Sequence, residues 1–130
     1  MKQEIRVTNS EWYVMNCLWE KNPRSLMQIV PLLSENVGWS KSTCATMLRR
    51  MSEKGLIGYK MEGKTKYFYP KVKKEDVVVQ ETRDFLKRIY DGSIGMMMSA
   101  LVRQDSLSDE DIKELQAILK AAEEKSKNSK

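Results

Sequence analysis

Apolar residues recur every three or four positions through the first part of the chain, a spacing that predicts amphipathic helices. A first helix is predicted in TNSEWYVMNCLWEK, where Thr8 and Glu11 have the spacing of a capping box. A second helix is predicted in SLMQIVPLLSENVG, where Ser25 and Gln28 repeat that spacing. Pro31 lies inside this segment and has no backbone N–H, so we expect it to kink the helix or shift its start.

A third helix is predicted in SKSTCATMLRRMSEKG, with Ser40 as its N-cap and Gly55 as its left-handed terminator. Two β-rich segments follow, LIGYKM and KYFYPKV, on either side of a glycine-containing tip at residues 62–65. Pro70 marks the end of the second strand. Three helices and a hairpin, in this order, predict a winged-helix domain over residues 1–73, in a fold that is mainly α.

The rest of the chain has only helical patterns, ending in SDEDIKELQAILKAAEEK with acidic residues in its first turn. A unit this small rarely buries enough apolar surface to be stable alone. We therefore expect residues 74–125 to be a helical dimerisation region, followed by a frayed tail at 126–130. The alternative is that these helices fold back onto the winged helix of the same chain. The residues expected at the dimer interface are Phe85, Ile89, Met97, Leu101, Ile112, Leu115 and Leu119.

The two faces of the third helix differ in chemistry. Four apolar residues, Cys44, Met47, Leu48 and Met51, share one arc that must face the core. The opposite arc carries small side chains and two arginines instead of the long Glu/Lys pairs typical of a solvated face. Hydroxyls, a methyl group and arginines suit a helix that enters the major groove of DNA.

This arc predicts two sets of DNA contacts. The residues expected to contact bases are Ser42, Thr43, Ala45, Thr46 and Arg49. The residues expected to contact phosphates are Lys41, Arg50, Lys60, Lys64 and Lys66. Any one of these lysines could instead be the solvated protection of an edge strand, but their clustering beside the helix favours phosphate contact.

The charge distribution supports a polyanionic partner. Residues 39–74 hold ten Lys/Arg and two Asp/Glu, a net charge of +8, although the whole chain carries only +5. There is no histidine and no glycine-rich phosphate loop, so we expect neither an enzyme nor a cofactor. Cys17 and Cys44 lie in helical patterns and are expected to be reduced, buried thiols rather than metal ligands. No apolar run could span a membrane and the start lacks a signal-peptide pattern, so we expect a cytoplasmic protein.

Several motifs also resemble those of one family, the penicillinase repressors known as BlaI/MecI. In the first half these are SEWYVM at 10–15, Leu18-Trp19, the Trp39-Ser40 pair with Thr43, Thr46 and Arg50, and Lys54-Gly55-Leu56-Ile57. Later motifs are Tyr67-Phe68-Tyr69, Phe85-Leu86 with Ile89-Tyr90 and Gly92, and Leu107-Ser108 with Ile112, Glu114-Leu115 and Ile118-Leu119. The resemblance covers nearly the whole chain.

The resemblance implies a dimeric winged-helix repressor that binds dyad operators, often with a TACA/TGTA core, upstream of resistance genes. It places Thr43, Thr46 and Arg50 at recognition-helix positions. Ala45 stands where the family has arginine and Arg49 where it has threonine, so the operator sequence is expected to differ.

The resemblance also implies relief of repression by proteolysis near Ala100-Leu101, triggered by a membrane sensor metalloprotease. The family pattern has Asn then Phe at the cleaved bond, and this chain departs from it. Relatives that respond to copper carry a Cys-x-Cys pair near the carboxy terminus, which this chain lacks.

Two other readings remain open from the sequence. One is a winged-helix regulator released by a small ligand that binds between the dimer helices. The other is a protein-interaction module whose winged helix does not bind DNA.

Overall fold

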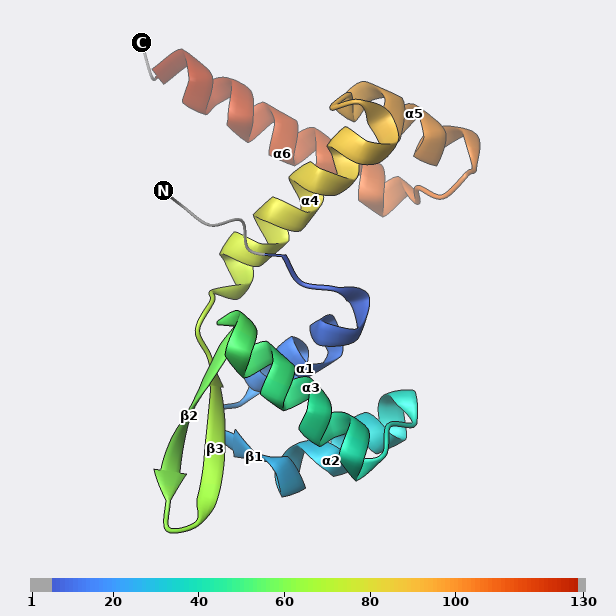
Figure 1. Ribbon diagram of the computed structural model, residues 1–130. Helices are drawn as coiled ribbons and strands as arrows, with labels where there is room; N and C mark the ends of the chain where they lie inside the picture. The colour runs from blue at the N-terminus through green and yellow to red at the C-terminus, as the bar shows by residue number, and fades with distance from the viewer. Residues whose placement is uncertain (1–5, 129–130) are drawn as a thin grey trace. The chain divides into compact units, whose positions relative to one another are not determined.

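The computed structural model describes residues 6–128, and the chain divides into two compact units, Met1–Arg83 and Asp84–Lys130 (Figure 1). The described residues form α1 (Asn9–Glu20), β1 (Arg24–Ser25), α2 (Leu26–Val37), α3 (Lys41–Lys54), β2 (Ile57–Glu62), β3 (Thr65–Pro70), α4 (Lys74–Tyr90), α5 (Ile94–Arg103) and α6 (Asp109–Asn128). The three helices and the hairpin predicted for a winged helix are therefore confirmed, as is the helical remainder.

Side-chain caps fix the starts of the first two helices where the sequence predicts them. The Thr8 hydroxyl accepts a hydrogen bond from the Glu11 amide at 3.2 Å, and Glu11 Oε1 accepts one from the Thr8 amide at 2.9 Å. At α2, Gln28 Oε1 accepts a hydrogen bond from the Ser25 amide at 2.8 Å. The helix continues past Pro31 from that capped start, so the start is not shifted.

The sheet contains one strand that the sequence analysis missed. Its order is β1-β3-β2, with both pairings antiparallel. The new strand, β1, is only two residues long and pairs with Tyr67 and Phe68 of β3, so it has no periodicity to detect. In the hairpin, Glu62 pairs with Thr65 across a two-residue turn. Gly63 has φ +63° there, the left-handed conformation that such turns require.

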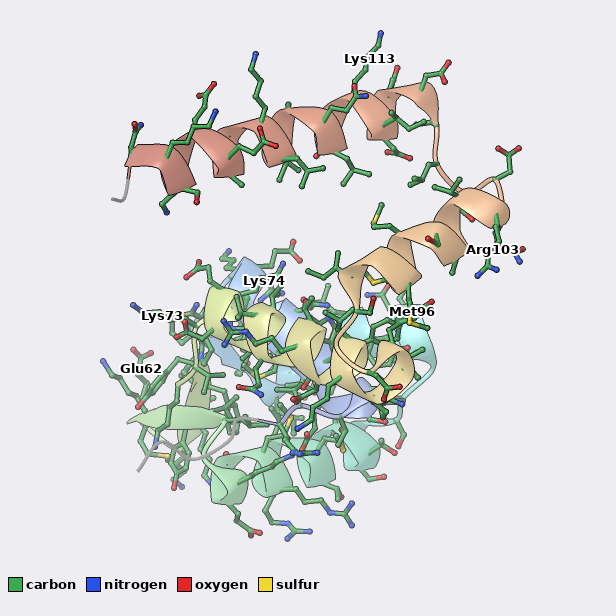
Figure 2. The ribbon with its side chains drawn as sticks, turned by 90° about the horizontal axis from the view of Figure 1, so that it is seen from above. Glu62, Lys73, Lys74, Met96, Arg103 and Lys113 are labelled. Carbon is green, nitrogen blue, oxygen red and sulfur yellow. The ribbon has the colours of Figure 1, made fainter. Side chains whose placement is uncertain are left out.

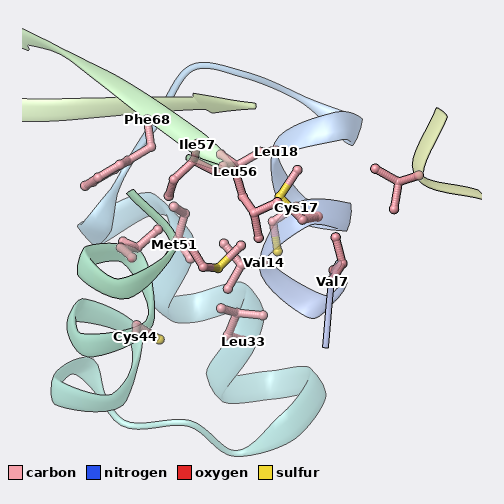
Figure 3. Close-up of a cluster of buried hydrophobic side chains, with 14 residues drawn as sticks. Val7, Val14, Cys17, Leu18, Leu33, Cys44, Met51, Leu56, Ile57 and Phe68 are labelled. Carbon is pink, nitrogen blue, oxygen red and sulfur yellow. The ribbon is translucent and has the colours of Figure 1, made fainter. Parts of the chain in front are cut away.

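The hydrophobic core lies within the first unit (Figure 3). In Figure 3, Leu33 of α2, Met51 of α3 and Leu56 lie around Val14 of α1. Cys44, Leu48 and Met51 form the buried face of α3, as predicted, whereas Met47 is only half-buried. Both cysteines are free and buried, and burial raises the pKa of each thiol, so both stay protonated at neutral pH.

The first turns of α4 belong to the first unit. Val77 is fully buried in the core, and the Val7 amide donates to Glu81 Oε1 at 3.3 Å. The division between the units therefore falls inside α4, after Arg83, and not at residue 73 where the sequence analysis places a domain boundary. The sequence pattern predicts an apolar stripe of Val78, Phe85, Leu86 and Ile89 along this helix, but it omits the buried Val77, and Val78 is 41% exposed.

The second unit has a different character. None of the described residues from 84 to 128 is buried, and α5 and α6 make few contacts with each other. Lys113 extends from the side of α6 that faces away from α5 (Figure 2). Of the expected frayed tail, residues 126–128 continue α6, and residues 129–130 lie outside the described part of the chain. None of the described helices is long and apolar enough to cross a membrane.

Candidate nucleic-acid interface

The outer face of α3 presents the residues that the sequence analysis selects for DNA. Ser42, Thr43, Ala45 and Arg49 are exposed, and Thr46 is half-buried at the edge of this face. The face is turned outward because Cys44, Leu48 and Met51 on the opposite side are packed in the core.

Hydroxyl groups cluster at the amino-terminal end of α3. The Ser40 hydroxyl accepts a hydrogen bond from the Thr43 amide at 3.2 Å and donates to Thr43 Oγ1 at 3.1 Å. Ser42 Oγ lies 3.1 Å from the same Ser40 oxygen. Lys41 is exposed beside them, at the positive end of the helix dipole. This end of the helix is therefore suited to a phosphate group.

A groove of about 710 Å³ separates α3 from the hairpin β2–β3, which we call the wing. Figure 1 shows the wing extending alongside α3 and the start of α2. The groove is lined by Ser25, Leu26, Met27, Ala45, Thr46, Leu48, Arg49, Ser52, Glu53, Tyr59, Lys64, Thr65, Lys66 and Phe68. It joins three of the predicted base-contacting residues to two of the predicted phosphate-contacting lysines.

Three cations and one carboxylate line this groove. The Lys66 ammonium lies over the Tyr59 ring, 4.5 Å from its centroid, so its positive charge is held against the wing. Arg49 Nη1 lies 3.5 Å from Glu53 Oε1, one turn further along α3. Lys64 occupies the tip of the wing. The positive groups therefore come from two separate elements that face the same space.

The remaining predicted phosphate contacts lie outside the groove. Tyr59 pairs with Phe68 and both line the groove, so Lys60, the next residue along the strand, projects from the opposite face of the wing. Arg50 is exposed on α3 and forms no ion pair within residues 6–128. Lys73 and Lys74 project near the start of α4 (Figure 2).

A partly buried ion pair fixes the carboxy-terminal end of α3. Lys54 Nζ lies 2.8 Å from Glu11 Oε1, and the Glu11 side chain is only 9% exposed. Burial raises the pKa of Glu11, but hydrogen bonds from Lys54 and the Thr8 amide and the charge of Lys54 outweigh it, so the pKa lies below its usual value. Lys54 therefore positions the helix and is not available to DNA.

The sequence analysis missed the groove's apolar lining, which includes Met27 of α2 and Tyr59 and Phe68 of the wing. The sequence does contain a signal that predicts the positions of Tyr59 and Phe68. A two-residue turn at Gly63-Lys64 sets the register that pairs Tyr59 with Phe68 and puts both on one face. Met27 could not be found in this way because its place depends on tertiary packing.

Comparison with known proteins finds relatives that match most of the chain. The pattern of the penicillinase repressor family matches residues 7–121. The penicillinase repressor of Bacillus licheniformis is 30% identical over 119 residues, which cover 92% of this chain and 93% of that protein. The methicillin resistance regulatory protein MecI of Staphylococcus aureus (strain N315) is 29% identical over 113 residues, which cover 87% of this chain and 92% of that protein.

One solved structure connects the fold to DNA. The solution structure of monomeric Bacillus licheniformis BlaI in complex with the blaP half-operator is similar, with a TM-score of 0.51 and 28% sequence identity. The similarity covers 58% of this chain and 93% of that chain. The winged-helix prediction agrees with this likeness.

Proposed function

The chain belongs to the penicillinase repressor family, whose members are DNA-binding transcriptional repressors rather than enzymes, and we propose that it acts as a homodimer on a two-fold symmetric operator. The observation that carries this proposal is the groove between α3 and the wing, where Ala45, Thr46 and Arg49 face the same space as Lys64 and Lys66. The helix face can reach base edges in a major groove while the wing lysines contact the flanking phosphates.

Each residue has a distinct role in this interface. Base edges are met by Ser42, Thr43, Thr46 and Arg49, and Ala45 offers a methyl group; Ser42 and Thr43 lie at the capped start of the helix. Lys41, Arg50, Lys60, Lys64 and Lys66 contact phosphates. The half-operator complex of the Bacillus licheniformis relative supports this use of the fold.

The exposed helices of the second unit support the homodimer. Phe85, Ile89, Ile112 and Leu119 are between 42% and 63% exposed in the single chain. Leu101 is 37% exposed, and Met97 and Leu115 are half-buried. Helices that carry this much exposed apolar surface gain stability by packing against a copy. Two-fold packing also matches a symmetric operator.

We expect the regulated genes to include antibiotic-resistance genes, in keeping with the penicillinase and methicillin-resistance regulators among the relatives. Occupation of the operator blocks transcription, and cleavage near Ala100-Leu101 by a membrane sensor metalloprotease relieves it. Both residues lie in the carboxy-terminal half of α5, which contains no buried residue. Such a short, unburied helix unfolds locally at low cost, giving a protease the extended backbone it needs. Cleavage there detaches Leu101 together with α6, and with them four of the seven proposed interface residues. The site of action is the cytoplasm.

The test is an electrophoretic shift titration of the full chain on the dyad duplex upstream of its gene, beside a shuffled duplex. Arg50→Ala removes one phosphate contact from each subunit of the dimer, so the Kd should rise by about tenfold and the salt slope should fall by about 1.8. Lys113→Ala, on the outer side of α6, is the matched control and should leave both unchanged. Equal affinity of the wild-type chain for both duplexes, or a flat salt response, would contradict the proposal.

A further inference from the structure

The outer face of α3 contains one residue whose charge opposes DNA. Glu53 is the single acidic residue of the helix, against Lys41, Arg49, Arg50 and Lys54. It is 67% exposed and lines the groove together with Arg49, Lys64 and Lys66. Any phosphate that enters this groove therefore approaches a carboxylate as well as three cations.

The geometry connects Glu53 to the arginine that reads bases. Glu53 Oε1 lies 3.5 Å from Arg49 Nη1, four residues away on the same face of the helix. An exposed pair of this kind contributes little to stability, so stability does not account for a carboxylate placed here. The Glu53 carboxylate has a larger effect on Arg49, because it competes with any anion for the Arg49 guanidinium.

We propose that Glu53 is a specificity-determining residue that suppresses binding to non-operator DNA through its ion pair with Arg49; this inference rests on the proposed function. On non-operator DNA the best partner for Arg49 is a phosphate, and Glu53 competes with that phosphate for the guanidinium. On the operator a guanine edge offers Arg49 two acceptors, which compensate for opening the pair. The carboxylate thus weakens non-operator binding more than operator binding.

The experiment first selects the operator, so that no gene assignment is needed. The full-length chain is used to enrich a duplex from a random-sequence library, and Kd values are measured for that duplex and for a shuffled duplex of the same composition. Glu53→Gln keeps the size of the side chain and removes its charge. The matched control is Glu35→Gln, the same charge change at an exposed position of α2 outside the groove.

Glu53→Gln should lower the Kd for the shuffled duplex by about fivefold to tenfold, as expected for one additional phosphate contact per subunit, and should steepen its salt slope by about 1.8. The Kd for the enriched duplex should change by less than about twofold, so the specificity ratio falls. Glu35→Gln should leave the ratio unchanged. An equal gain on both duplexes, or no change on either, overturns the proposal.

A second comparison tests whether the effect runs through Arg49. In an Arg49→Gln background, Glu53→Gln should change the shuffled-duplex Kd by less than about twofold, because no guanidinium remains to be released. A full effect in that background overturns the role of the ion pair. If the wild-type chain enriches no sequence at all, the proposed function itself fails. If the wild-type chain is selective and Glu53→Gln leaves the specificity ratio unchanged, only the inference about Glu53 is overturned.

Discussion

The two units of the chain share the same quality of local helix signals but differ in what their apolar residues do. The starts of α1 and α6 carry reciprocal caps of the same kind, at Thr8 with Glu11 and at Ser108 with Asp111. In the first unit these caps lead into helices that share a buried core, whereas no described residue from 84 onward is buried. Capping therefore determines where a helix forms, and a packing partner determines whether its apolar face is buried.

The largest effect is expected from a substitution that disrupts the proposed dimer contact of the second unit. Leu119→Asp places a charge on the most exposed large hydrophobic residue of α6, 63% exposed in the single chain. If two copies pack there, sedimentation should show monomers, and operator affinity should fall by about 10²–10⁴-fold because bivalent binding is lost. The unfolding midpoint of the first unit should not change.

The control for this variant introduces the same charge on the other side of the helix. Lys113→Asp, which changes a side chain on the outer side of α6, should leave both mass and affinity close to wild type. A Leu119→Asp chain that stays dimeric and binds its operator normally would mean that α6 takes no part in the interface.

The next largest effect concerns the core of the first unit. Met51→Ala empties a fully buried site on α3 and should reduce the free energy of unfolding by about 2–5 kcal/mol. Val102→Ala shortens a side chain that is 61% exposed on α5. It should change the free energy of unfolding by less than about 0.5 kcal/mol. Urea denaturation followed by circular dichroism measures both. Similar costs for the two variants would show that α5 is as well packed as α3.

A third prediction uses pH, because the first unit contains a buried carboxylate with a lowered pKa. The Glu11 carboxylate stabilises the fold above its unfolded pKa, near 4.3, and this stabilisation is lost as pH falls through the lower folded pKa. Glu11→Gln should cost about 1.5–3 kcal/mol at pH 7 because the Lys54 ammonium loses its anionic hydrogen-bond acceptor. The difference between variant and wild type should shrink below pH 4.3, and a constant difference would contradict this assignment.

The sequence predicted the first unit well because its signals are local. Capping boxes, the glycine at the end of α3 and the hairpin tip each depend on a few neighbouring residues, and all were confirmed. What it missed depends on tertiary contact. The two-residue strand β1 exists only because β3 offers an edge, and Val77 is distinguished from Val78 only by which side of α4 meets the core.

In the candidate site, too, some features follow from local sequence and others depend on tertiary contacts. The outward direction of Arg49 and Thr43 followed from helix periodicity, and the structure agrees. The wing lysines looked equivalent in the sequence, yet Lys66 lines the groove while strand alternation turns Lys60 to the opposite face. Met27 joins the groove from α2 without any sequence signal. Contacts to DNA at all of these positions stay predictions.

The smallest predicted effect compares one substitution in both units. Ser40 caps α3 and Ser93 caps α5, each by accepting a hydrogen bond from the amide three residues later, at 3.2 Å and 3.1 Å. Ser40→Ala should lower the unfolding free energy of the first unit by about 1 kcal/mol, because α3 unfolds together with its core. Ser93→Ala should fray only α5, and amide hydrogen exchange there should accelerate while that of α1–α3 stays unchanged.

The pair of variants also separates helix capping from DNA binding. Ser40 organises the hydroxyls of Ser42 and Thr43, so Ser40→Ala should weaken operator binding beyond the effect of Ser93→Ala, at temperatures where both chains are folded. If Ser93→Ala instead slowed or accelerated exchange throughout the first unit, the two regions would unfold together. The lack of burial in the second unit would then be a poor guide to its energetic independence.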